Sequence, residues 1–184
     1  AAMRLRSLGM VLVRLGRYDE AEPYLEQSLA EFRGLGNDPN AGITTCALAL
    51  ATYGQGDLVR AKQRCNEAIG LYRTMGSRYS PAATLVLLGL IACERGNSDG
   101  AVSAFADAFD QGQAAGDHAG PPDRTAGVAV LAVRCGYPEV AGRLFGAATA
   151  RTMGLGELFL PPVLPTYERA IAAARSALGE DRFA

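Results

Sequence analysis

An internal repeat of 40 residues is the feature that most constrains the fold of this chain. Four segments share a glycine followed five residues later by an alanine, and the first of them is Gly16-Arg-Tyr-Asp-Glu-Ala21. The equivalent glycines are Gly56, Gly96 and Gly136. A second series with the same step consists of Gly36, Gly76, Gly116 and Gly156. Periods of roughly 20–50 residues are typical of solenoids, because a single unit cannot bury its apolar face alone.

Both glycine series predict where helices end. Glycine adopts the left-handed conformation that closes a helix at little cost, and each glycine here follows an apolar run of helical period. Asp19, Asp57 and Asn97 can then cap, or place charge at, the start of the next helix. We therefore expect two helices in each unit. First helices are predicted near residues 2–15, 40–54, 80–94 and 123–135, and second helices near 18–35, 58–75, 98–115 and 138–153.

Small residues recur where the two helices of a unit should touch. An apolar residue precedes a small one in each first helix, as in Leu8-Gly9, and each second helix carries an alanine followed by a larger residue such as Leu25. A small residue lets two backbones approach, and a larger one fills the space beside them. The predicted repeat-packing residues are Gly9, Gly16, Ala21, Ala49, Gly56, Ala61, Gly89, Gly96, Ala101, Gly136 and Ala141.

Over residues 3–156 this pattern resembles the tetratricopeptide repeat. The resemblance rests on the Leu8-Gly9 pair, the glycine between helices, Tyr18, and the recurring alanine, aromatic and alanine of the second helix. The period of 40 exceeds the usual 34 or so, and the chain has no Trp. HEAT-like repeats also run near 40 residues, but the glycine and small-residue spacing fit the tetratricopeptide repeat better. The resemblance implies an all-α, right-handed α-solenoid whose four helix pairs occupy about 1–36, 37–76, 77–116 and 117–156.

The C-terminal residues 157–184 are predicted to be a loop followed by a capping helix. Pro121-Pro122 and Pro161-Pro162 are the clearest breaks in the helical pattern. After the second break, the segment from Tyr167 to Leu178 reads as a ninth helix. The sequence then ends at Gly179-Glu-Asp-Arg-Phe-Ala184, which suggests a helix stop and the start of another helix.

Composition argues against several classes of protein. The net charge is −1 with 20% charged residues, so there is no electrostatic footprint for nucleic acid or an anionic membrane. No apolar run approaches the ~20 residues that span a bilayer, and no secretory signal is evident, so we expect a cytoplasmic protein. Lys62 is the only lysine among 18 basic residues, which is typical of a GC-rich bacterial genome. Because the first residue is Ala1, the chain can be a segment of something longer.

No residue pattern predicts an enzyme, a metal site or a cofactor. The sequence lacks phosphate-loop, dinucleotide, nucleophile-elbow and metalloprotease motifs. His118 beside Asp117 is the only histidine and is expected to be a solvated loop residue. The four cysteines are not spaced as a zinc site, and we expect them to be buried reduced thiols. They are Cys46, Cys65, Cys93 and Cys135.

In this repeat family the first helices line a concave face along which partners lie. The side chains predicted for that face are mostly apolar with an arginine near each end: Arg6, Met10, Val13, Cys46, Leu50, Tyr53, Val86, Leu90, Cys93, Val130 and Arg134. Two interpretations stay open. The face is a groove for an amphipathic helix or an extended apolar segment, or a tight superhelix or the ninth helix covers it and makes it core.

The C-terminal region has a second resemblance. Ala141-Gly-Arg-Leu-Phe-Gly-Ala-Ala148, Leu164-Pro-Thr-Tyr-Glu-Arg169, Ala172-Ala-Ala-Arg-Ser-Ala-Leu-Gly179 and Phe183 are similar to the repeat region of large actinobacterial regulators. Those proteins combine a nucleotide-binding switch, such repeats and often a LuxR-type DNA-binding domain. The resemblance implies a sensory or autoinhibitory module for transcription control that binds a protein, a peptide or neighbouring domains. The alternatives are a small-molecule inducer sensor, or a homodimerisation module of a signalling protein such as a cyclase or kinase.

Overall fold

The computed structural model describes residues 1–74, 81–114, 122–150 and 161–179. Within these residues the chain consists of helices and connecting turns, without a strand. The helices are α1 (Ala2–Arg14), α2 (Tyr18–Gly34), α3 (Asp38–Gly54), α4 (Leu58–Thr74), α5 (Ala82–Glu94), α6 (Ser98–Ala114), α7 (Pro122–Arg134), α8 (Pro138–Thr149) and α10 (Leu164–Leu178). The all-α solenoid predicted from the repeat is confirmed for this part of the chain.

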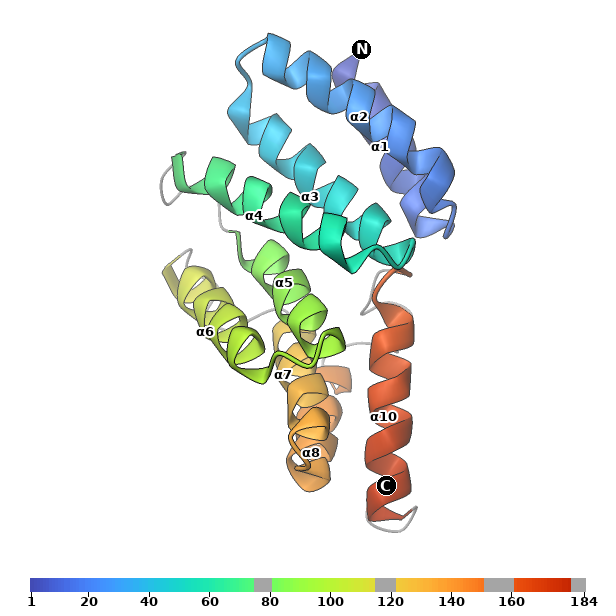
Figure 1. Cartoon of the computed structure of the whole chain (residues 1–184), viewed down its shortest axis with the longest axis vertical. Coiled ribbons are helices and arrows are strands. Elements are labelled where there is room, and N and C mark those ends of the chain that lie inside the picture. Colours follow the sequence, from blue (N-terminus) through green and yellow to red (C-terminus); the bar gives the residue numbers. More distant parts are fainter. Residues whose placement is uncertain (75–80, 115–121, 151–160, 180–184) are drawn as a thin grey trace.

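The helices stack as pairs along the long axis of the molecule (Figure 1). Each first helix packs against the second helix of its own unit, so α1 pairs with α2, α3 with α4, α5 with α6, and α7 with α8. Each later first helix also packs on the second helix of the unit before it. Beyond the four pairs, α10 lies beside α7 and α8 (Figure 1). The boundaries between units stay a prediction.

Each inter-helix glycine closes a helix as the sequence predicts. Gly16 has φ 73°, and its N–H donates to the Val13 carbonyl at 3.1 Å while the Arg17 N–H donates to the Leu12 carbonyl at 2.9 Å. These two bonds satisfy carbonyls that the end of a helix leaves free. Positive φ angles recur at Gly36, Gly56, Gly96 and Gly136. Gly76, Gly116 and Gly156 lie outside the described residues.

Helix starts follow the expected chemistry in two ways. An Asp57 carboxylate oxygen accepts a hydrogen bond from the Arg60 N–H at 3.0 Å, and the Asn97 side chain accepts one from the Gly100 N–H at 3.0 Å. Asp19 makes no such bond but lies in the first turn of α2, where its negative charge interacts favourably with the positive end of the helix dipole. Capping and charge therefore both contribute at these turns.

Small residues set the distance between paired helices. A Cβ atom added at Gly9 would lie 2.6 Å from Cγ of Leu25, and one added at Gly89 would lie 2.6 Å from Cε1 of Phe105. The second-helix alanines predicted to pack are completely buried: Ala21, Ala61, Ala101 and Ala141. Larger side chains of α2 and α6 thus occupy the space that the glycines of α1 and α5 leave open.

Two hydrophobic clusters form the core, and α3 contributes to both. Ala47, Leu48 and Ala51 belong to the cluster of the first unit. Ala49 and Tyr53, on another face of α3, belong to the cluster of the later units and α10. Helix α3 thus packs into the core of the preceding unit with one face and into the core of its own unit with another, so the hydrophobic core continues from unit to unit.

Two boundaries differ from expectation. Helix α10 begins at Leu164 rather than at Tyr167, and Pro165 stands in its first turn, where a proline costs no hydrogen bond. Helix α8 ends at Thr149, about one turn before the predicted end at 153. The expected start of a further helix after Gly179 falls outside the described residues. Among those described, no helix has the length and apolar character needed to cross a membrane.

Candidate functional site

The side chains predicted for the concave face fall into two groups. Six of the eleven are buried: Val13, Tyr53, Val86, Leu90, Cys93 and Val130. Four are half-buried, namely Arg6, Met10, Cys46 and Leu50, and Arg134 is exposed. For the buried positions the structure favours the interpretation that this face is core. A partner groove along the whole face stays untested. Of the eleven predicted residues, those accessible to a partner are Arg134 and the four half-buried side chains, which form the accessible strip.

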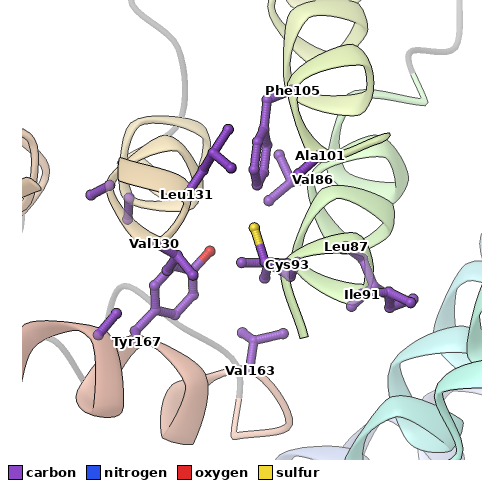
Figure 2. Close-up of a cluster of buried hydrophobic side chains, with 14 of the residues drawn as sticks. Val86, Leu87, Ile91, Cys93, Ala101, Phe105, Val130, Leu131, Val163 and Tyr167 are labelled. Atoms are coloured by element: carbon purple, nitrogen blue, oxygen red, sulfur yellow. The ribbon is translucent and has the colours of Figure 1, made fainter. Parts of the chain in front are cut away.

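Helix α10 closes the C-terminal part of the face. Its buried side chains are Thr166, Tyr167, Ala170 and Ala174. Figure 2 shows the Tyr167 ring beside Val130 of α7, with Cys93 of α5 pointing into the same cluster. Val163, just before α10, completes this side of the cluster (Figure 2). These contacts bury Cys93 and Val130 in the C-terminal part of the predicted groove.

A polar network holds the N-terminal end of α10. The hydroxyl groups of Tyr53 and Thr166 are hydrogen-bonded at 2.7 Å, and Thr166 donates to a Glu94 carboxylate oxygen at 2.8 Å. Arg169 pairs with the same Glu94 oxygen at 2.5 Å. Because the Thr166 proton goes to Glu94, Tyr53 is the donor to Thr166. The network joins α3, α5 and α10 across the repeat stack.

A cavity of about 240 Å³ opens beside this network, between α5, α7 and α10. Its polar lining includes Glu94, Thr166, Arg134 and Arg169. Arg169 is neutralised by Glu94, whereas Arg134 forms no ion pair or hydrogen bond within the described part of the chain. The cavity therefore offers one free guanidinium to an anionic group.

The accessible strip lies on α1 and α3. Arg6 donates to the Asn40 side-chain oxygen at 2.7 Å, and its guanidinium lies 5.5 Å from the centre of the Phe32 ring. Met10 and Leu50 pack at the edge of the N-terminal core. The strip therefore consists of partly exposed apolar side chains next to an arginine that is already held in position.

The cysteines do not form a reactive centre. All four are free, and Cys65 and Cys93 are buried as expected, but Cys135 is exposed, which corrects the prediction for that residue. Burial raises the pKa of Cys46 despite a hydrogen bond from Thr84, and burial raises the pKa of Cys93 to about 11. Thiols held protonated in this way are weak nucleophiles.

Other candidates for chemistry give no site either. His118 and Asp117 fall outside the described residues. Within the part of the chain that the structure describes, no group of three or more His, Cys, Asp or Glu side chains could hold a metal ion.

Sequence reasoning missed two features of the surface. The network of Glu94, Thr166 and Arg169 joins segments more than 70 positions apart, and no local pattern predicts it. The outward face of α1 leaves Leu8 44% and Val11 52% exposed. Leu8 has the same place in its repeat as the buried Leu48, so no signal within the repeat identifies it as exposed.

Comparison with known proteins supports a tetratricopeptide repeat domain. Residues 1–74, which hold the first two helix pairs, match the family described as tetratricopeptide repeat. No curated protein matches the chain. Tetratricopeptide repeats generally mediate binding between proteins, and their all-helical fold is typically a scaffold without catalytic groups.

Proposed function

We propose that this chain is a protein-binding repeat module that serves as the sensory part of a bacterial transcriptional regulator. The observation that carries the binding role is the accessible strip of Arg6, Met10, Cys46 and Leu50, which lies within the residues that match the tetratricopeptide family. Partly exposed apolar side chains around a positioned charge are typical of peptide-recognition surfaces.

The chemistry of the strip specifies the partner. Met10 and Leu50 accept an apolar side chain, and methionine adapts to several shapes because it is unbranched. Arg6 is held by Asn40, so little side-chain entropy is lost when it meets a carboxylate. The proposed ligand is therefore an amphipathic helix or an extended apolar segment with an acidic residue at one end.

Leu50→Asp tests the strip. A carboxylate at this half-buried position should weaken partner binding at least roughly tenfold, because a charge would enter the apolar contact. Val59→Asp is the control for the added charge, since Val59 is 55% exposed on α4, and a thermal melt of each variant separates loss of binding from loss of the fold. A photoreactive residue at position 50 should capture a partner that position 59 does not. Equal capture at both positions would remove the strip from consideration.

The regulatory role rests on the C-terminal resemblance to large actinobacterial regulators. We expect a nucleotide-binding switch domain or a DNA-binding domain in the parent protein. We also expect Leu50→Asp to change the ATPase rate or reporter transcription of that protein while helicity by circular dichroism stays the same. A parent protein with neither domain would refute this role and would leave the binding role standing.

The cavity between α5, α7 and α10 favours a second candidate, a small-molecule sensor. Its volume of about 240 Å³ and the free Arg134 guanidinium suit a small carboxylate or phosphate compound. Such a ligand should raise the melting temperature of the wild type but not of Arg134→Ala. A panel of small anionic compounds without any Arg134-dependent shift would eliminate this candidate.

A further inference from the structure

Helix α1 exposes a face that every other first helix buries. The face consists of Arg4, Ser7, Leu8 and Val11, which share one side of the helix at the i, i+3, i+4, i+7 spacing. All four residues are exposed. Forty residues later, the equivalent side chains of α3 are buried: Thr44, Ala47, Leu48 and Ala51.

The same positions are covered in the third and fourth units. Thr84, Leu87 and Ile91 of α5 are buried and Leu88 is half-buried; on α7, Arg124, Gly127 and Leu131 are buried and Val128 is half-buried. The second helix of the preceding unit packs on each of α3, α5 and α7, and Thr84 also donates to Cys46 of α3. The outer face of α1 thus repeats an interface that the chain forms three times.

Arg124 shows how an arginine at this position docks. Arg4 is its equivalent, three repeats earlier. On α7, Arg124 is 1% exposed and donates to the Ala108 carbonyl of α6 at 3.1 Å, with its guanidinium 5.6 Å from the centre of the Phe109 ring. Gly112 makes room for it, because a Cβ there would overlap the guanidinium.

Side-chain sizes are complementary across this repeated interface, so that a larger residue on one helix faces a smaller one on the other. The register pairs Arg124 with Gly112, but pairs the smaller Thr44 and Thr84 with Phe32 and Tyr72. Three residues along the first helix, Gly127 meets Phe105, since a Cβ on Gly127 would lie 2.5 Å from Cε1 of the ring. The same register pairs Ala47 with Leu25 and Leu87 with Cys65. A helix on α1 would accordingly need a small residue opposite Arg4 and a leucine-sized residue opposite Ser7.

We infer that the outer face of α1, formed by Arg4, Ser7, Leu8 and Val11, is a docking site for an amphipathic helix of the second-helix type, with glycine or alanine opposite Arg4 and leucine opposite Ser7. This site is separate from the accessible strip, so the result of its test does not depend on the proposed function. Its occupant continues the interfaces of α2 with α3, α4 with α5, and α6 with α7.

Charge distinguishes this occupant from a second copy of α1. Helix α1 carries Arg4, Arg6 and Arg14 and no acidic residue. Two such helices packed together would repel each other. By contrast, α6 carries Asp99, Asp107 and Asp110 and no basic residue. An acidic second-type helix is therefore the better complement.

The test uses the full chain and a synthetic peptide. The peptide has the sequence of residues 98–114 with Phe105→Leu, a fluorescent label, and a hydrocarbon staple across the outward positions 102 and 106. The staple removes most of the cost of ordering an isolated helix. Fluorescence anisotropy should show saturable binding to the wild-type protein. Val11→Asp should weaken it at least roughly tenfold, because a carboxylate would enter an apolar interface. Val59→Asp, equally exposed on α4, should leave it unchanged.

A size swap tests the register. Gly112→Phe in the peptide should abolish binding to the wild type, because the ring would take the place of the Arg4 guanidinium. Arg4→Thr in the protein should restore binding of that peptide, reproducing the pairing of Thr44 with Phe32. Absence of saturable binding, equal weakening by Val59→Asp, or failure of this rescue would each overturn the inference. A dimer in light scattering that Val11→Asp dissociates would overturn it too, because the occupant would then be a second copy.

Discussion

The hydroxyl groups of Tyr53 and Thr166 lie 2.7 Å apart although 113 positions separate them in the sequence. Tyr53 stands near the C-terminal end of α3, one turn beyond Leu50 of the accessible strip, and Thr166 stands in the first turn of α10. The bond therefore marks the border between the part of the concave face that α10 covers and the part that stays accessible. A partner bound along the strip would approach this border, so the surface that binds the partner adjoins the surface on which α10 docks.

Thr166→Val should loosen α10. The substitution keeps the shape of the side chain but leaves the buried Tyr53 hydroxyl without its hydrogen-bond partner and leaves Glu94 with Arg169 alone. The free energy of unfolding should fall by about 1–3 kcal/mol. Amide exchange over 164–178 should accelerate more than in α1–α4. Ser176→Ala, at an exposed position of the same helix, is the control and should change neither quantity. Unchanged exchange in α10 would show that the network does not hold the helix.

Gly9→Ala should destabilise the first unit. The added methyl group would lie 2.6 Å from Leu25, so the side chain or the backbone must shift, at a cost of about 1–3 kcal/mol. Gly70→Ala is a matched control, because Gly70 is also helical and has no atom within 4 Å of an added Cβ. There the alanine should be neutral or stabilise by about 0.5–1 kcal/mol. Urea denaturation measures both changes, and equal effects would contradict the close packing of α1 on α2.

Alkaline pH should destabilise the protein. Burial raises the pKa of Cys93 to about 11 and also raises the pKa of Cys65. In the unfolded chain a thiol ionises near pH 8.5, so above that value the unfolded state binds fewer protons and stability falls as pH rises. Each thiol should contribute a loss on the order of 1–2 kcal/mol by pH 10.

Urea denaturation at several pH values from 7 to 10 checks this prediction. Cys93→Ala should reduce the slope of stability against pH above 8.5, whatever its effect at pH 7, where the thiols are protonated in both states. Tyr53 and Tyr72, whose pKa values burial raises to about 12, extend the loss to more alkaline solution. A pH-independent free energy of unfolding across this range would be inconsistent with buried, protonated thiols.

Cys135 should be the fastest thiol to react in the native protein. It is exposed, whereas Cys65 is fully buried and Cys93 is 1% exposed. Ellman's reagent should show a fast phase that Cys135→Ser lacks, with the two buried thiols reacting only on unfolding. Cys46, half-buried and hydrogen-bonded by Thr84 at 3.2 Å, should react at an intermediate rate. Mass spectrometry that finds Cys93 modified in the fast phase would contradict the packing of α10.

Local features of the sequence predicted the helices and the way each pair packs. Gly16 and its equivalents end helices because only glycine adopts a positive φ without strain, and Gly9 lies against Leu25 because the repeat places a small residue opposite a large one. These relations act over a few residues or over one helix pair, so a single chain with four copies of the pattern reveals them.

Only the tertiary structure decided which surfaces are accessible. Val86, Leu90 and Val130 have the spacing of groove residues but are buried, because α3 and α7 pack on α5 and α10 packs on α7. Leu8 has the same spacing as the buried Leu48, and it is exposed because no described helix packs on the outer face of α1. The sequence by itself thus determined the repeating unit. The exposure of a side chain depends on which helices pack beside its unit, and the sequence pattern within one unit does not specify those neighbours.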